Sequence, residues 1–164
     1  MLHIEIPGRE TLELRHLVCD FNGTLACDGV FLDDVPERLA QLGQSLDLHI
    51  LTAGTHGGLD IAKERLVAAF QAAGVAATPH WQPIATGTDK AAYVVQLGAK
   101  QVIAVGNGAN DALMLQQATL SIAILGLEGL ARAAADAAMI VCPSPLAALD
   151  LLLHSKRLIA TLRL

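Results

Sequence analysis

Aromatic and charged residues are scarce in this chain of 164 residues, at 3% and 16% respectively. With so few aromatic side chains, the core must be built from Leu, Ala, Val and Ile, which supply most of a hydrophobic content of 53%. A chain of this length lies in the usual range for one domain and can bury a substantial core. We therefore expect a single domain over residues 1–164.

The sequence also has few cysteines, a negative net charge and no long apolar run. The three cysteines, Cys19, Cys27 and Cys142, are odd in number and irregular in spacing, which argues against a disulfide framework or a zinc cluster. A formal net charge of −5 argues against general binding of nucleic acid. No apolar run reaches the roughly 18 residues that span a bilayer, and the start of the chain does not resemble a secretory signal. The sequence predicts a cytoplasmic protein without a nucleic-acid or membrane partner.

Apolar runs alternate with helical patterns along the chain. Strands are expected near residues 48–52, 101–105, 120–125 and 138–142, with a weaker one near 75–80. Helices are expected near residues 36–45, 58–73, 89–97, 110–118, 128–135 and 145–153. Residues 2–6 and 11–19, around a Pro7-Gly8 turn, predict a hairpin that leads into the first core strand. This alternation predicts an α/β fold with a doubly wound, mainly parallel sheet and helices on both faces.

The most informative segment is Asp20-Phe21-Asn22-Gly23-Thr24, which directly follows the apolar run of residues 16–19. A carboxylate at the end of a buried strand is placed to act as a nucleophile. Gly23 and Thr24 can then turn the chain sharply and offer amides and a hydroxyl to phosphate oxygens. Asn-Gly is also a common turn signal, so the segment by itself equally fits an ordinary strand-ending turn.

A second segment, residues 101–111, repeats the pattern of an apolar run followed by a glycine-rich polar turn, here with Asn107 and Asp111. The carboxyl ends of parallel strands share one edge of a sheet, so two such turns can form one site. Thr52 and Ala53 follow a third apolar run, and Lys90 begins a helical stretch before Gly106. Residue types and order together favour phosphoryl transfer.

This order of motifs, from about residue 16 to residue 114, resembles the haloacid dehalogenase superfamily, and most closely its small proteins related to P-type ATPases. The resemblance implies a haloacid dehalogenase-like Rossmannoid fold. It also implies that Asp20 attacks phosphorus, that Gly23, Thr24, Thr52, Ala53 and Lys90 hold the phosphoryl group, and that Thr52 and Lys90 support catalysis. Asp20, Asn22, Asn107 and Asp111 would hold Mg²⁺, with the backbone carbonyl of Asn22 as one ligand.

Two asparagines depart from the acidic pattern of the superfamily. Asn22 stands where an Asp would protonate the leaving group and activate water, and a carboxamide cannot exchange a proton near neutral pH. The usual contribution of general acid–base catalysis, about 10²- to 10⁴-fold, should therefore be missing. Asn107 stands where an Asp would bind magnesium, so Mg²⁺ should bind weakly.

The spacing of the motifs leaves no room for a cap domain, because only short intervals separate Thr24, Thr52 and Lys90. Residues 25–31 predict a small hairpin flap around Asp28-Gly29, since Asp-Gly is a strong tight-turn signal. An uncapped site must stay open, admit a large substrate or be covered by another subunit. Uncapped relatives often form tetramers, so a homo-oligomer is expected.

Two functions remain open at this point. One is a slow, magnesium-dependent phosphohydrolase or phosphotransferase that acts on a phosphorylated substrate through an aspartyl phosphate. The other is a catalytically impaired protein that keeps the fold for binding or regulation. Roles for Asp28, His56 and His80 also stay open. Asp28 could replace the missing acid or only make a turn. His56 could touch a substrate or be an exposed histidine at the start of a helix, and His80 could line the same edge or pack beneath a loop.

Overall fold

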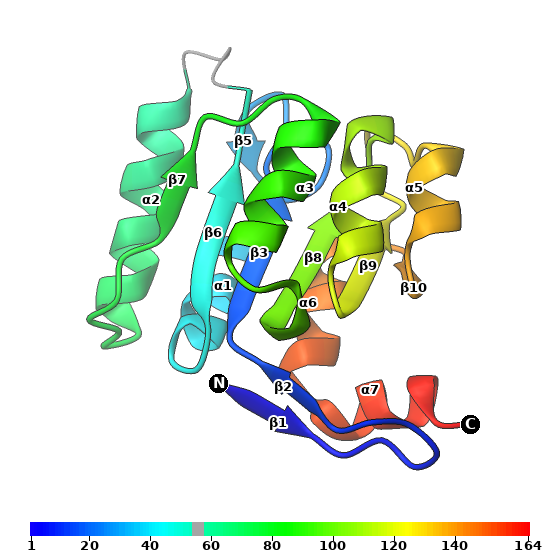
Figure 1. The fold of residues 1–164 in the computed structure, drawn as a ribbon. Helices are drawn as coiled ribbons and strands as arrows, with labels where there is room; N and C mark the ends of the chain where they lie inside the picture. Colours follow the sequence, from blue (N-terminus) through cyan, green and yellow to red (C-terminus); the bar gives the residue numbers. More distant parts are fainter. Residues whose placement is uncertain (54–57) are drawn as a thin grey trace.

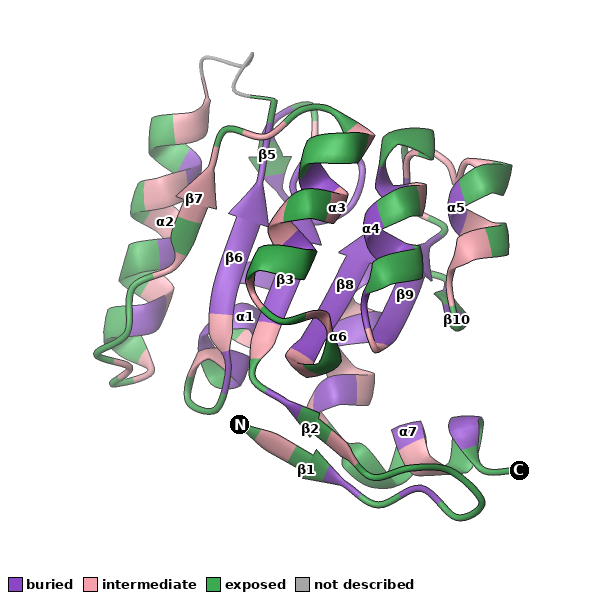
Figure 2. Cartoon of the chain, viewed as in Figure 1, coloured by how far each residue is buried: buried purple, intermediate pink, exposed green. Residues whose placement is uncertain are grey.

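A six-stranded parallel sheet forms the centre of the computed structural model, which describes residues 1–53 and 58–164 (Figure 1). All neighbouring strands are parallel. The order across the sheet is β10 (Ile140–Cys142), β9 (Leu120–Ile124), β8 (Val102–Gly106), β3 (His16–Asp20), β6 (Asp47–Leu51) and β7 (His80–Gln82). Strands β3, β8 and β9 are buried along nearly their whole length, as their continuous apolar sequences predict (Figure 2).

Helices cover both faces of the sheet, and each face has its own core cluster. One layer contains α1 (Val35–Gly43), α2 (Leu59–Ala72) and α6 (Pro145–Leu153). The other contains α3 (Gly87–Gln96), α4 (Ala112–Gln117) and α5 (Arg132–Ala137). The expected doubly wound α/β fold is confirmed.

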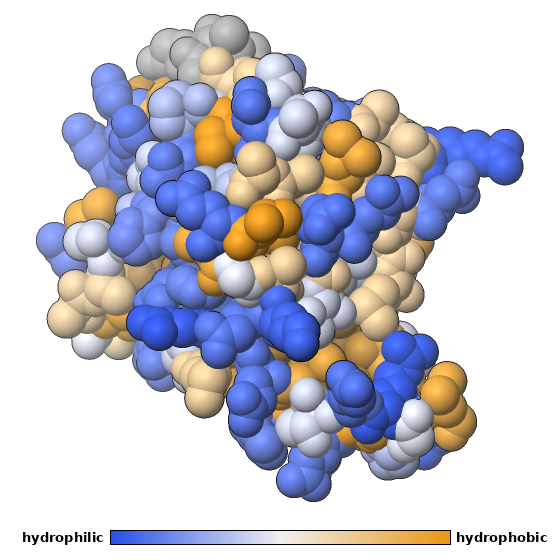
Figure 3. All heavy atoms as spheres, viewed as in Figure 1, coloured by the Kyte–Doolittle hydropathy of each residue, from blue (hydrophilic) through white to orange (hydrophobic). Residues whose placement is uncertain are grey.

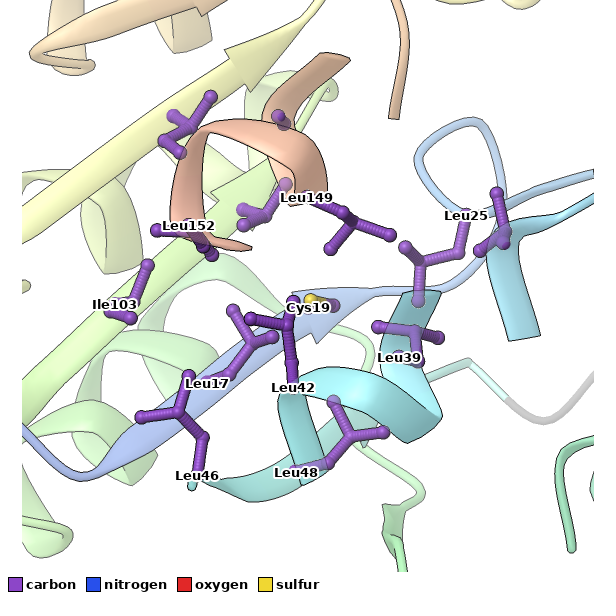
Figure 4. Close-up of a cluster of buried hydrophobic side chains, with 14 of the residues drawn as sticks. Leu17, Cys19, Leu25, Leu39, Leu42, Leu46, Leu48, Ile103, Leu149 and Leu152 are labelled. Atoms are coloured by element: carbon purple, nitrogen blue, oxygen red, sulfur yellow. The ribbon is translucent and has the colours of Figure 1, made fainter. Parts of the chain in front are cut away.

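The larger core lies between β3 and the layer of α1 and α6 (Figure 4). Leu17 and Cys19 of β3 are fully buried there, and Val18 between them points to the opposite core, as the two-residue repeat of a strand requires. Leu39 of α1 and Leu149 of α6 lie in the same cluster. This packing fixes β3, and with it Asp20, in the middle of the molecule.

Smaller elements surround these layers. The expected N-terminal hairpin is present as β1 (Leu2–Ile4) and β2 (Leu12–Leu14), and the expected flap as β4 (Ala26–Cys27) and β5 (Val30–Phe31). Asp28 and Gly29 both have positive φ, at 50° and 80°, which fits a tight hairpin turn. Two short 3₁₀ helices, η1 (Ala99–Gln101) and η2 (Ala109–Asp111), flank β8.

Three elements differ from the sequence expectation. The weak strand expected near 75–80 lies at His80–Gln82, because Pro79 has no N–H to donate to a ladder. The helix expected from residue 128 begins at Arg132, since Gly126 and Gly129 close a turn before it. Helix α7 (Ser155–Leu162) was not expected, and its Leu158 and Leu162 lie in the core cluster that also contains residues of the N-terminal hairpin.

The surface is mixed in character. On the face seen in Figure 3, hydrophilic side chains are interspersed with small hydrophobic patches. Among the helices of residues 1–53 and 58–164, none is long and apolar enough to cross a membrane.

Candidate active site

The candidate site lies where the strand order reverses. From β3 the chain proceeds to β6 on one side, and β8 pairs with β3 on the other. Asp20 ends β3 and Gly106 ends β8, so both turns singled out in the sequence leave the same edge of the sheet next to each other. Such reversal points are where open α/β sheets bind ligands.

Lys90 joins the two turns. The Thr86 hydroxyl caps α3 by accepting the N–H of Asp89 at 3.2 Å, and Lys90 follows in the first turn of the helix. Its side chain is only 1% exposed. The Nζ atom donates to Asp20 Oδ1 at 2.5 Å and to Asp111 Oδ1 at 2.7 Å. One buried cation thus bridges two carboxylates from different strand ends.

Asp111 is held in place by its own turn. Its Oδ2 accepts the backbone N–H groups of Asn107 at 3.0 Å and Gly108 at 2.8 Å. A Cβ on Gly106 would lie 2.6 Å from Asp111 Cγ, so only glycine allows this close approach. The glycine-rich sequence after β8 therefore serves to place a fully buried carboxylate against Lys90.

The turn after Asp20 is linked to the turn after β8 through Thr24. The Thr24 hydroxyl lies 3.3 Å from Asp20 Oδ2 and 3.0 Å from Asn107 Oδ1, and its single proton can serve one of them at a time. Gly23 has φ 79°, and its N–H donates to the Ala26 carbonyl at 2.8 Å. Gly23 therefore shapes the turn, and its contact with phosphate stays a prediction.

Burial and charge set the protonation of the central groups. Burial, with the negative charge of Asp111, raises the pKa of Asp20 to about 7, although Lys90 opposes this shift. Burial by itself would lower the pKa of Lys90, but the two carboxylates outweigh it and raise that pKa. Lys90 is consequently an ammonium group at neutral pH.

The remaining predicted residues lie around this centre or outside the described part. Thr52 follows Leu51, the partner of Asp20 in the sheet register, and its backbone N–H donates to Gln82 O at 3.0 Å. Thr52 is buried and Ala53, next to it, is exposed. Phosphate binding by either stays a prediction. His56 lies outside the described residues.

Two residues whose roles the sequence left open, His80 and Asp28, make contacts away from Lys90 and its two carboxylates. His80 stacks on His49 with ring centroids 4.9 Å apart, on β7 and β6. Asp28 is exposed in the flap turn, and its backbone N–H donates to Glu128 Oε1 at 3.2 Å. Glu128 was not singled out by the sequence, where it fell in an expected helix. Its position between two glycines directly after an expected strand was the signal that could have identified it.

The oxygen atoms here suit a hard cation such as Mg²⁺. Asn22 Oδ1 is buried and has no hydrogen-bond partner in the described part of the chain, and Asp20 Oδ2 makes a long contact of 3.3 Å with the Thr24 hydroxyl. Asn107 Oδ1 accepts one bond, which leaves a lone pair. Asp111, in contrast, uses both oxygens on Lys90 and backbone N–H groups. These oxygens can hold a cation, although asparagines at positions 22 and 107 give the site less negative charge than the acidic pattern of the superfamily. Direct ligation of the cation by Asp111 stays a prediction.

Comparison of the sequence with known proteins identifies one relative. No family model matches the chain. The uncharacterized protein MJ0073 of Methanocaldococcus jannaschii is 45% identical over 64 residues, which cover 39% of this chain and 69% of that protein. At this identity and coverage, the two proteins are members of one family.

Solved structures share the fold. A Legionella pneumophila structure assigned to subfamily III A of the HAD (haloacid dehalogenase) superfamily has a TM-score of 0.63 at 17% identity, covering 90% of this chain and 87% of that one. The 3-deoxy-D-manno-octulosonate 8-phosphate phosphatase of Moraxella catarrhalis, in complex with magnesium, phosphate and KDO, has a TM-score of 0.59 at 14% identity, covering 92% and 94%. The catalytic domain of the CPx-ATPase CopB-B has a TM-score of 0.53 at 22% identity, covering 79% of this chain and 46% of that one. The chain therefore has the HAD superfamily fold, with no cap domain in residues 1–53 and 58–164, and it belongs to the same family as MJ0073.

Proposed function

We propose that the protein is a slow, magnesium-dependent phosphohydrolase or phosphotransferase that forms an aspartyl phosphate on Asp20. The observation that carries this proposal is the Lys90 ammonium group between Asp20 and Asp111 at the reversal point of the sheet. A cation in this place stabilises the ionised nucleophile. It can also stabilise the negative charge on the phosphoryl group during transfer to Asp20. The phosphatases of the same fold support the proposal by analogy.

In the proposed reaction Asp20 attacks phosphorus and the alcohol or phosphate leaving group departs. Lys90 and Thr52 hold the phosphoryl oxygens, with Gly23, Thr24 and Ala53 around them. Magnesium, when bound by Asp20, Asn22 and Asn107, supplies positive charge to the phosphoryl oxygens. Asn22 cannot donate a proton to the leaving group, so turnover is slow. The substrate is a phosphorylated small molecule, with sugar phosphates as the first class to test.

The test is hydrolysis of p-nitrophenyl phosphate with and without Mg²⁺. We expect slow, magnesium-dependent release of p-nitrophenol, and none from Asp20→Asn. The double variant Asn22→Asp with Asn107→Asp should be faster by about 10²-fold or more, because it restores proton transfer and metal charge. If this variant folds and remains inert on a broad panel of phosphate esters, the protein is a binding or regulatory protein instead.

We also propose that copies of the chain associate through the flap. Val30 of the flap is 63% exposed and Ile61 of α2 is 72% exposed. They line a cavity of about 120 Å³ together with Phe31 and Ala62. Light scattering after gel filtration should show an oligomer, and Ile61→Asp should shift it to monomers, while Val95→Asp on an exposed face of α3 should not. A monomeric wild type would contradict this.

A further inference from the structure

The hydrolysis of an aspartyl phosphate needs a base that Asn22 cannot supply. Water must lose a proton as it attacks phosphorus, and a carboxamide does not accept one near neutral pH. In the phosphoenzyme Asp20 carries the phosphoryl group, and the buried carboxylate of Asp111 is hydrogen-bonded to Lys90 and to backbone N–H groups. Any base for this step must therefore come from another element at the edge of the sheet.

The loop of residues 125–131, between β9 and α5, is fixed to that edge at several points. Gly129 O accepts the Asn107 side-chain Nδ2–H at 3.1 Å, and the Ala131 N–H donates to Asn107 O at 2.9 Å. Gly126 lies so close to the turn after Asp20 that a Cβ on it would be 3.0 Å from Gly23 O. The loop therefore has a defined position relative to both turns of the candidate site.

Glu128 extends from this loop to the turn that carries Asn22. A Cβ on Gly23 would lie 3.0 Å from Glu128 Oε2 and 2.6 Å from Asn107 Nδ2, so the Glu128 carboxylate lies beside Gly23, near the Asn107 amide. The other oxygen, Oε1, accepts the N–H of Asp28 in the flap at 3.2 Å. One oxygen is thus anchored and the other lies next to the residue after Asn22. Glu128 is exposed, so it can exchange protons with solvent.

We propose that Glu128 is the general base that replaces the missing acid at position 22; this inference rests on the proposed function. The oxygen of a water molecule bonds to phosphorus, and the bond between phosphorus and the Asp20 oxygen breaks, which returns Asp20 as a carboxylate. One proton of the water passes to Glu128, directly or through a second water, and then to solvent. Inorganic phosphate is the product. Formation of the phosphoenzyme does not need Glu128.

The experiment follows the two steps separately. The full chain is phosphorylated with ³²P-labelled acetyl phosphate and Mg²⁺, the donor is removed, and loss of label is timed. We expect Glu128→Gln to form phosphoenzyme at the wild-type rate and to lose it about 10- to 100-fold more slowly. Glu128→Asp, which keeps a carboxylate, should recover part of the rate. Asp136→Asn, which removes an exposed carboxylate on α5, should lose label at the wild-type rate.

A fourth variant separates a chemical role from a structural one. In the Asn22→Asp background a base is present at position 22, so adding Glu128→Gln should slow hydrolysis far less than it does in the wild type. Equal rates for wild type and Glu128→Gln, or equal slowing by Asp136→Asn, would overturn the role of Glu128 and leave the proposed function intact. A wild type that forms no phosphoenzyme would overturn both.

Discussion

At the scale of single residues, Lys90 is the group on which the site most depends. It is buried between two carboxylates, and removal of one partner from a buried ion pair leaves charge without compensation. We expect Lys90→Met to lower the free energy of unfolding by about 3 to 5 kcal/mol at neutral pH, measured by urea denaturation. Lys100→Met, at an exposed position, should change it by less than about 0.5 kcal/mol. Similar losses in both variants would contradict the placement of Lys90.

A second buried group, His49, lies away from the reacting centre and ties β6 to α3. Its Nε2 lies 3.1 Å from His16 Nδ1, and its Nδ1 lies 2.9 Å from the Tyr93 hydroxyl, one helical turn after Lys90. Burial, with the nearby His80 and His16, lowers the pKa of His49 to about 4, and Asp47 opposes this only in part. The folded protein therefore keeps His49 neutral.

This shift predicts how stability depends on pH. The unfolded chain binds a proton on His49 below about pH 6.5, whereas the folded protein does so only near pH 4. The contribution of His49 to stability is therefore complete above about pH 6.5 and falls as the pH drops towards 4, by about 2 to 3 kcal/mol. Urea denaturation at pH 7.5 and pH 4.5 should show a smaller loss for His49→Gln than for the wild type. An equal loss would exclude His49 as the cause.

Residue types in order along the chain were enough to predict the central residues. Asp20, Lys90 and Asp111 could be singled out from their order and from the apolar runs near them, and their side chains lie within hydrogen-bond distance in the structure, while their roles in catalysis stay predictions. Glu128 was not predicted: the glycines on either side of it were a local signal for a turn, but the contacts with Asn107 that bring this loop to the site are not encoded by any local pattern.

At the scale of elements, close packing of β8 against η2 controls the position of Asp111. We expect Gly106→Ala to displace Asp111, to lower the free energy of unfolding by about 1 to 3 kcal/mol and to reduce hydrolysis of p-nitrophenyl phosphate. The matched control is Gly58→Ala, whose added Cβ would lie at an ordinary 3.5 Å from Gly29 O. Wild-type stability in Gly106→Ala would show that the turn has room to adjust.

Elements with a continuous apolar run or a clear helical repeat were predicted well, and those set by distant contacts were not. Strand β9 and helix α6 lie where the pattern predicted them. A strand buried on both faces has a continuous apolar sequence, and a helix packed on a sheet has apolar residues at helical spacing, so both signals lie within the element itself. Leu158 and Leu162 of helix α7 are buried in the core cluster that also contains Ile4 and Leu14 of the N-terminal hairpin, which lies far away in the sequence. Helix α7 has only eight residues, and one pair of leucines four apart is too short a pattern to identify a helix.

At the scale of the whole molecule, the sheet order brings distant segments into one site. The alternation of strands and helices predicted a parallel sheet. The polar turns after its strands predicted that the candidate site lies at the edge formed by the carboxyl ends of the strands. The placement of β3 beside β8 is a property of the topology, and it is what lets Lys90 reach both carboxylates.

The proposed reaction requires that Asp20 becomes phosphorylated, and covalent trapping of the phosphoenzyme can detect this. The full chain would be incubated with acetyl phosphate and Mg²⁺, quenched in acid, and digested for peptide mass spectrometry. We predict a hydroxylamine-sensitive phosphate on the peptide that contains Asp20, absent from Asp20→Asn and short-lived in Asn22→Asp. A folded wild type that carries no phosphate on Asp20, or carries it equally at other carboxylates, would contradict the account.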